Sequence, residues 1–518
     1  MTRLRGIDPQ PARGQKRTRY VTPVFTATVF KHNGEPITME AYDIHPAGPR
    51  RTSDIVSCRT SKSVRSPMGT FSMVAVPRKL DYFEEIDVGD WCEIKSDNGD
   101  GKGLRPLMYG PITDVRDSKL VDQKGAVIRR IHITGADFGK VFTSMCGIND
   151  AKLAGDPAFT NLGLGALASS LKTAVGSPST MVKKIIDIFL NALTQWVDPR
   201  TGRTFGLGTL DVSYISNTLG NAVPEIILLS GNLWQILMQW ANVAMNEMFV
   251  DYRPPASDPG DFTNLTPAFI LRQFPFYGDD WNFLTSVVVD TDEVRSSELG
   301  KSESDVRNWI RVHDDPRLTA TRDGIVVYLE KAGTVNAESI KRFGYKRYEP
   351  TTQYIFDPGG IETVTSDFVG PPATTPPKSI PNILQEMSSW NTLWHHSNEL
   401  LVNGTIETYH LPDVRVGYRY DLLNRETGKN MEFYVEAVSH TLQFPGESST
   451  LATVTRGRDP NDKRFSDYLD KLIADGVVQE LGSTIDRVGD ALKGGEAEST
   501  EGVKQVDDIL VTSLLDQF

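Results

Sequence analysis

The stretch Met431-Glu432-Phe433-Tyr434-Val435-Glu436-Ala437-Val438-Ser439-His440 decides the fold class of this chain. Its apolar and polar residues alternate, which is typical of a half-buried β-strand. The turn Glu426-Thr427-Gly428-Lys429 precedes it, inside a β-rich block that runs from Thr405 to Gly457. We expect His440 to be a hydrogen-bonded histidine at the sheet edge. Four other residues should share one face: Phe433, Val435, Ala437 and Ser439.

A second β-rich block runs from about Val21 to Lys140. Polar, glycine-containing turns separate its strands: His32-Asn33-Gly34-Glu35, Asp97–Gly103 and Asp122–Gly125. The expected strands are Val24–Phe30, Ile37–Asp43, Asp54–Thr60, Thr70–Val76, Asp90–Lys95, Leu107–Val115 and Val127–Thr134. Short strands with such turns predict a closed barrel or a sandwich.

The region between the blocks has helical patterns. Met181–Trp196 is predicted to be a helix, and a second helix is predicted from Pro224 to Phe249. The uncharged run Ile226–Asn246 is long enough to cross a bilayer, but amides recur along it at spacings of three and four. They are Asn232, Gln235, Gln239, Asn242 and Asn246. Five amides are costly in lipid, so we predict no membrane insertion and a helix buried in protein or against another subunit.

The remaining segments are short of strand signals. Asp251–Pro267 is a proline-rich break, and a mixed segment with one strand, Ile325–Glu330, follows it. Val369–Pro381 holds five prolines and is the clearest linker. Helices are predicted at Ile383–Leu400 and from Arg464 onward, where three glycines weaken an apolar stripe and the final residues are acidic.

Composition limits the function. At 518 residues the chain is long enough for about three to five domains. Its formal net charge of −12 argues against nucleic-acid binding through a basic surface, sequence-specific binding included. Three cysteines (Cys58, Cys92 and Cys146) form no CxxC pair, so we expect buried thiols and synthesis in a reducing bacterial cytoplasm.

The first twenty residues carry six basic side chains against Asp8 and lack the apolar core of a signal peptide. They form either a disordered basic tail or an arm that reaches an acidic neighbour.

A search for catalytic and ligand-binding motifs is negative. HExxH, Walker-type phosphate loops and GxSxG are missing from the sequence, and the adjacent pair His395-His396 cannot converge on one metal from a helix. Gly163-Leu164-Gly165 and Gly206-Leu207-Gly208 lack the context of a dinucleotide fingerprint. The carboxylate pairs Glu84-Glu85 and Asp279-Asp280 are common by chance among 67 acidic residues. We therefore predict no enzyme activity, and no catalytic, cofactor-binding or metal-binding residues.

Several segments, in order and spacing, resemble phage tail baseplate hub proteins of the contractile-tail type. The second block carries Leu401–Ile406, Leu411–Gly417, Phe433–His440 and Thr450–Gly457. The first block carries Ser57–Lys62, Gly69–Met73, Val88–Trp91 and Ile133–Phe138. The middle of the chain adds Asp292–Ser296, Ser302–Asn308 and Lys341–Gly344. Residues 151–250, and those after Asp459, match no part of this family pattern.

The resemblance implies an α+β, mainly β chain with two tube-like β-barrel domains, a helical and mixed insertion between them, and a helical C-terminal segment. The predicted divisions are a basic arm (1–20), the first barrel (21–147), a helical insertion (148–260), a mixed α/β domain (261–368), a linker (369–381), a helix with the second barrel (382–460) and a helical acidic segment (461–518).

In function, the resemblance implies a structural hub in the virion tail baseplate. Three copies would form a homotrimeric ring that adapts the sixfold tail tube to a threefold central spike and lines part of the channel for DNA ejection. The expected partners are the tail tube protein, the spike and other baseplate or tape-measure proteins. Two alternatives stay open: a tail-associated peptidoglycan hydrolase, and the hub of a bacterial contractile injection or secretion system.

Overall fold

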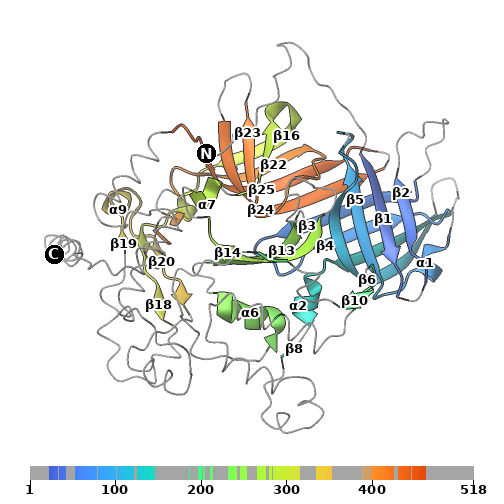
Figure 1. The fold of residues 1–518 in the computed structure, drawn as a ribbon. Coiled ribbons are helices and arrows are strands. Elements are labelled where there is room, and N and C mark those ends of the chain that lie inside the picture. Colours follow the sequence, from blue (N-terminus) through green and yellow to red (C-terminus); the bar gives the residue numbers. More distant parts are fainter. Residues whose placement is uncertain are drawn as a thin grey trace, which may run out of the picture.

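The computed structural model describes residues 23–41, 53–144, 146–147, 186, 197–204, 211–213, 231–241, 246–253, 265–275, 279–314, 334–352, 388, 391–395, 398–424 and 430–462, with short gaps inside several of these ranges. Strands dominate the described residues, and the helices are few and short (Figure 1). The mainly β prediction is confirmed. Thirteen of the strands form one sheet that curls into two halves.

The first half follows the predicted strands closely. It comprises β1 (Val24–Phe30), β2 (Ile37–Ala41), β3 (Ile55–Ser63), β4 (Thr70–Ala75), β5 (Trp91–Asp97), β6 (Arg105–Val121) and β7 (Val127–Ala136). Their order across the sheet is β2-β1-β5-β6-β7-β4-β3. The two ends of this row meet where the Asp54 backbone N–H donates to the Glu40 carbonyl at 3.1 Å. Phe25, Met39 and Met73 belong to the apolar core that the seven strands enclose.

The second half draws strands from two distant parts of the sequence. Its strands are β15 (Ser286–Asp290), β16 (Val294–Gly300), β22 (Val402–Tyr409), β23 (Arg419–Leu423), β24 (Asn430–Gln443) and β25 (Ser449–Arg458). They follow the order β16-β22-β25-β24-β23-β15. The 3-10 turn η3 (Thr291–Glu293) joins β15 to β16 and is closed by a capping box on Asp290. The segment expected to be a separate mixed domain therefore supplies two strands to this half.

The halves share strand β24. Its first residues pair with β23, and its later residues pair antiparallel with β3, from Ala437↔Ser63 to Gln443↔Ser57. Along this one strand, Phe433 and Val435 lie in the second core and Leu442 lies in the first. Figure 1 shows the first half, in blue, beside the orange strands of the second half.

The predicted side-chain alternation of β24 is wrong beyond Val435. The register with β25 shifts between Val435 and Ala437, which marks a β-bulge. Because one extra residue reverses the facing of all later side chains, Val438 and His440 point inward and Ala437 does not. His440 is also not at an edge, since its strand pairs with β3 on one side and β25 on the other.

The helix predicted from Pro224 to Phe249 is wrong in its second half. Helix α6 (Leu233–Ala241) is followed by strand β13 (Asn246–Arg253). Asn232 caps α6, accepting from the Gln235 backbone N–H at 2.9 Å, whereas Asn246 lies in β13 and donates its side-chain amide to the Ala241 carbonyl. The predicted amide stripe is therefore split between a helix and a strand. No helix in the described ranges is long and apolar enough to span a bilayer.

Strand β13 belongs to a three-stranded sheet that packs on the second half. Strand β14 (Thr266–Gln273) is its central strand and pairs with β13 on one side and β11 (Asp211–Ser213) on the other. Phe249 of β13, with Ala268 and Ile270 of β14, lies in the second core. In Figure 1 these green strands run beneath the orange ones. The region expected to be a helical insertion therefore contributes β-structure to the core.

The other elements are short. They are α1 (Tyr82–Glu85), α2 (Lys140–Ser144), β8 (Cys146–Gly147), β9 (Val197–Asp198), β10 (Arg203–Thr204), β12 (Gly231–Asn232), α7 (Asp279–Asn282), η4 (Glu303–Asp305), β17 (Trp309–Ile310), β18 (His313–Asp314), β19 (Thr334–Val335), α9 (Ala337–Phe343), β20 (Arg347–Tyr348) and β21 (Thr351–Thr352). The described residues of the predicted helix Ile383–Leu400 are helical at Ser388 and from Asn391 to His395, and a turn follows at 398–400.

Several predicted features lie outside the described residues. They are the N-terminal arm 1–20, most of the helix Met181–Trp196, the strand Ile325–Glu330, the linker Val369–Pro381, the turn Glu426–Lys429 and the C-terminal segment from Arg464. The domain boundaries stay a prediction.

Candidate functional site

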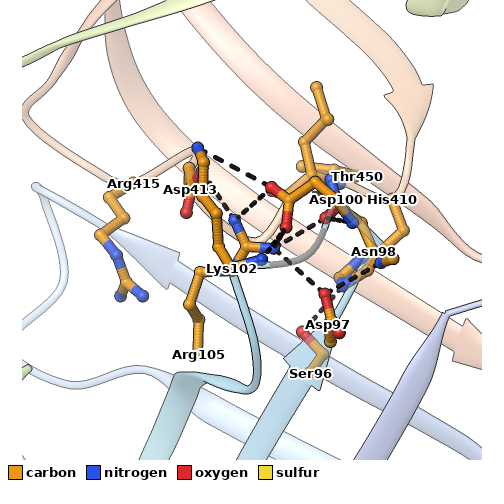
Figure 2. Close-up of polar contacts among 12 residues, drawn as sticks. Ser96, Asp97, Asn98, Asp100, Lys102, Arg105, His410, Asp413, Arg415 and Thr450 are labelled. Carbon is orange, nitrogen blue, oxygen red and sulfur yellow. Dashed lines mark hydrogen bonds and ion pairs between the residues drawn. The ribbon is translucent and has the colours of Figure 1, made fainter. Parts of the chain in front are cut away.

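A fully buried arginine joins the two halves of the sheet. Arg105 begins β6, in the first half, and its Nη1 atom donates to Asp413 Oδ2 at 2.8 Å, in the loop before β23 of the second half. The same guanidinium donates to Asp100 Oδ1 at 2.9 Å and to Asn98 Oδ1 at 2.7 Å (Figure 2). Buried charges need such partners, because an unpaired charge in the interior costs several kcal/mol.

The loop between β5 and β6 folds so that its side chains surround Arg105. Asp97, Asn98 and Asp100 each accept a hydrogen bond from the backbone N–H two residues further on, at 2.9, 3.3 and 3.0 Å. Gly99 has a φ of 73°, which glycine adopts without strain. Burial alone would raise the pKa of the Asp100 carboxyl, but hydrogen bonds from Lys102 N–H and Arg105 outweigh it and lower this pKa.

Two histidines lie behind this cluster. His410 Nε2 is 2.8 Å from Ser96 Oγ, so this pair also links β22 of the second half to β5 of the first. His440 Nδ1 is 3.0 Å from Thr450 Oγ1, and the two imidazole centroids are 5.6 Å apart. Burial, together with the charge of Arg105, lowers the pKa of His410 to about 3, and burial lowers that of His440 well below 6.5. Both rings are therefore neutral at pH 7.

A second buried cluster lies where β3, β7 and β13 approach each other. Lys62 Nζ is 3.1 Å from Asp251 Oδ1 and 3.5 Å from Asp137 Oδ2, and it lies 4.3 Å from the centroid of the Tyr252 ring. Arg415 reaches the same place, with Nη1 at 3.8 Å from Asp251 Oδ1 and Nη2 donating to the Pro106 carbonyl at 2.6 Å. Because Lys62, Asp137, Asp251 and Arg415 come from four separate segments, this cluster fixes the β13 hairpin between the two halves.

A third cluster holds the β13–β14 hairpin to the second half alone. Arg272 of β14 donates through Nε to Glu247 Oε1 at 2.5 Å and through Nη2 to the Gly417 carbonyl at 2.7 Å. The Tyr434 hydroxyl of β24 donates to the other oxygen of Glu247. Every formal charge in this cluster has a partner, as expected of a structural contact.

The rejected candidate groups remain apart from one another. Glu85, in α1, pairs with Lys31 at 2.9 Å, while Glu84 is exposed. Asp279 and Asp280 lie in α7. His395 packs against Tyr348, with ring centroids 4.4 Å apart and the planes tilted by 54°, whereas His396 and both glycine pairs lie outside the described residues. No group of three histidine, cysteine or acidic side chains gathers to hold a metal in the described part of the chain.

The cysteines occupy interior positions where the structure describes them. Cys58 and Cys92 are buried and free, as predicted. Burial raises the pKa of the Cys58 thiol to about 12 and raises that of Cys92 as well. Such thiols are poor nucleophiles. Cys146 lies in β8.

The contact of Arg105 with Asp413, here called the junction, has no local signature in the sequence. Residues 97–103 predict only a turn, and Asp413 and Arg415 belong only to a segment that resembles the family pattern. A guanidinium and an acidic partner that lie 308 positions apart leave no periodic signal in the sequence. The one available hint was an arginine directly after a loop rich in aspartate.

No protein-family model matches the chain, and no curated protein sequence matches it. Several solved structures are similar to the chain. The tail protein from Neisseria meningitidis MC58 has 11% identity and a TM-score of 0.44, over 83% of this chain and 96% of that one. The 43 kDa tail protein of prophage MuSo2 from Shewanella oneidensis has 10% identity and a TM-score of 0.42, over 84% and 97%.

A further match is an E. coli component of the type VI secretion system, with 6% identity and a TM-score of 0.37, over 80% of this chain and 76% of that one. All three are tail or secretion-system proteins. The chain is thus similar to proteins of this kind.

Proposed function

We propose that this chain is the structural hub of a phage tail baseplate, without enzyme activity of its own. Three copies form a ring that binds the sixfold tail tube on one side and a threefold central spike on the other. The ring belongs to the virion, lines part of the channel for DNA ejection and contacts further baseplate or tape-measure proteins of a contractile tail.

The observation that carries this proposal is the sharing of β24 by two β-halves. Each half has its own apolar core, and both cores contact the same strand. The ladder between β24 and β3 and the guanidinium of Arg105 hold the halves in one orientation. A rigid pair of β-units in each protomer supports the proposal, because three pairs supply six units at fixed spacing for a sixfold tube.

Net charge is compatible with a channel for DNA. Three copies of a chain with net charge −12 carry −36. Acidic walls repel the DNA backbone, so a passing duplex slides without binding.

The decisive experiment is electron microscopy of the purified chain, alone and mixed with the tail tube protein encoded beside it. We expect threefold rings with six similar densities, and rings at one end of assembled tubes. A stable dimer, or rings that never bind tube protein, would contradict the hub function. Clearing of a cell-wall gel by the purified chain would instead favour the peptidoglycan hydrolase.

A further inference from the structure

Exposed apolar side chains gather at one end of the first half. Of the thirteen large hydrophobic residues that are exposed in the described ranges, seven lie in or beside α1 and the β6–β7 hairpin. They are Leu80, Phe83, Val88, Leu120, Val121, Val127 and Ile128. Four of them face each other across the hairpin, at Leu120↔Ile128 and Val121↔Val127. Exposed apolar side chains grouped in this way are unusual on a protein that acts as a monomer and are typical of an interaction surface.

The outer part of the β6–β7 hairpin is a two-stranded ribbon, here called the tip ribbon (residues 118–121 and 127–130). Strand β5 pairs with β6 only as far as Pro111, and β4 pairs with β7 only from Ile131 onward. Beyond these points the described residues of β6 and β7 pair only with each other, up to Leu120↔Ile128 and Val121↔Val127. Both ribbon edges therefore present backbone groups without a strand partner. An isolated two-stranded ribbon is marginally stable in water.

The tip ribbon is nevertheless held in place at its base. Arg129 binds Asp117 across the ribbon, with Nε 2.9 Å from Oδ1, and binds Asp81, next to α1, with Nη1 2.7 Å from Oδ2. Val88 lies beside β6, because the neighbouring Gly89 N–H donates to the Ile112 carbonyl at 3.0 Å. These contacts orient the exposed apolar group before any partner binds.

The tip ribbon points away from the junction between the halves. Strand β6 starts at Arg105 in the junction and ends at Val121, and is seventeen residues long. At ~3.3 Å per residue its two ends are separated by roughly 50 Å along the strand. The apolar tip is thus available to a second molecule at the far end of the first half.

The second half offers a matching margin, here called the β15–β16 margin (residues 286–300). In the described part of the chain, β16 pairs only with β22 and β15 only with β23, so the outer edge of each lacks a neighbouring strand. Val288 is 58% exposed on this margin. The margin carries four acidic residues and one basic residue, a net charge of −3.

Charge distinguishes the two surfaces. The tip ribbon carries three basic residues, Lys119, Arg129 and Arg130, and no acidic one, a net charge of +3 within a chain of net charge −12. A positive surface with unpaired strand edges and apolar side chains complements a negative margin with an unpaired edge. A surface of the first half therefore carries the chemistry that a surface of the second half can bind, which is the requirement for a head-to-tail ring.

We propose that the tip ribbon of one copy docks on the β15–β16 margin of the next copy and closes the ring. This inference rests on the proposed hub function and adds the surfaces through which the copies bind. The occupant of the tip ribbon is a second copy of this chain.

Cysteine crosslinking tests the contact directly. The double variant Val121→Cys/Ser297→Cys, treated with a short bis-maleimide, should give dimers and trimers on a denaturing gel. Each single variant should remain at the monomer position, because a head-to-tail contact joins unlike surfaces. Crosslinking by Val121→Cys alone would indicate a symmetric contact and overturn the inference.

A charge substitution tests the apolar contribution. Val121→Lys/Val127→Lys should shift the purified protein from trimer to monomer in mass photometry and leave its melting temperature as monomer unchanged. Leu451→Lys, at an exposed position on β25 outside both surfaces, is the matched control and should leave the trimer intact. If rings form but both tests are negative, the contact is wrong and the hub function stands. If no variant or parent protein forms rings, with or without tube protein, both fail.

Discussion

Arg105 Nη1 donates to Asp413 Oδ2 at 2.8 Å and so joins residues that lie 308 positions apart in the chain. Arg105 is fully buried and also binds Asp100 and Asn98 of its own half. The guanidinium of Arg105 therefore divides its hydrogen bonds between both halves and, together with the ladder between β24 and β3, holds them in one orientation.

Replacing this arginine should loosen the junction. In Arg105→Met the carboxylates of Asp97, Asp100 and Asp413 lose their shared cation, and we expect a loss of about 3 kcal/mol in the free energy of unfolding. Urea denaturation followed by fluorescence measures the change. Arg116→Met removes an exposed arginine (76%) that pairs only with Asp114 and should change stability by less than about 0.5 kcal/mol. Equal losses in the free energy of unfolding in the two variants would show that the buried contacts of Arg105 stabilise the protein no more than the exposed ion pair does.

The Lys62 cluster should behave as a coupled pair. Lys62→Met leaves the buried carboxylates of Asp137 and Asp251 without their nearest cation, so we expect a loss of roughly 3–5 kcal/mol. In Lys62→Met/Asp251→Asn part of this loss should return, because the uncompensated charge is gone. A double-mutant cycle by urea denaturation gives the coupling free energy. Additive effects of the two substitutions would contradict a direct Lys62–Asp251 interaction.

A glycine substitution tests the packing of the β13–β14 hairpin on the second half. Gly417 has a φ of 72°, and a Cβ atom there would lie 2.5 Å from the Phe249 ring. Gly417→Ala should therefore lower the free energy of unfolding by about 1–3 kcal/mol, from backbone strain and steric contact together. Thermal unfolding measures it. Gly300→Ala, where a Cβ would contact nothing within 4 Å, should be nearly neutral.

The buried histidines should make the protein sensitive to acid. Their pKa values in the folded state lie below the ordinary 6.5, so the unfolded chain binds more protons than the folded one between pH 6.5 and about pH 3. The contribution of these neutral histidines to the free energy of unfolding is therefore fully present above pH 6.5 and is lost as the pH is lowered. For His410 alone the loss at pH 5 is about 2 kcal/mol.

Urea denaturation at several pH values between 5 and 7 measures this slope. His410→Gln keeps a polar group near Ser96 but cannot take up a proton, so its stability should depend less on pH in this range. His32→Gln, at an exposed position, should keep the slope of the parent protein. An unchanged slope in His410→Gln would exclude His410 as its source.

The strands of the first half and the long strand β24 of the second could be predicted because their signals are local. Alternating side chains and glycine turns placed Val24–Phe30 within one block and the later strands within the other, and the structure has strands there. Local signals predict the wrong secondary structure where a tertiary contact overrides them. The pattern from Pro224 to Phe249 is apolar and helical in spacing, yet Asn246–Arg253 pairs with Thr266–Gln273 as a strand, because ladder hydrogen bonds and a shared core are available there.

The sequence by itself determined the strands of the first half, the strand β24, the mainly β class and the lack of catalytic motifs. Only the tertiary structure decided that β24 serves two cores, that β15 and β16 complete the second half, and that Arg105 meets Asp413. The physical reason is the range of the interactions. Alternation and turn preferences act over a few residues, whereas strand order and buried ion pairs depend on which distant segments exclude water together.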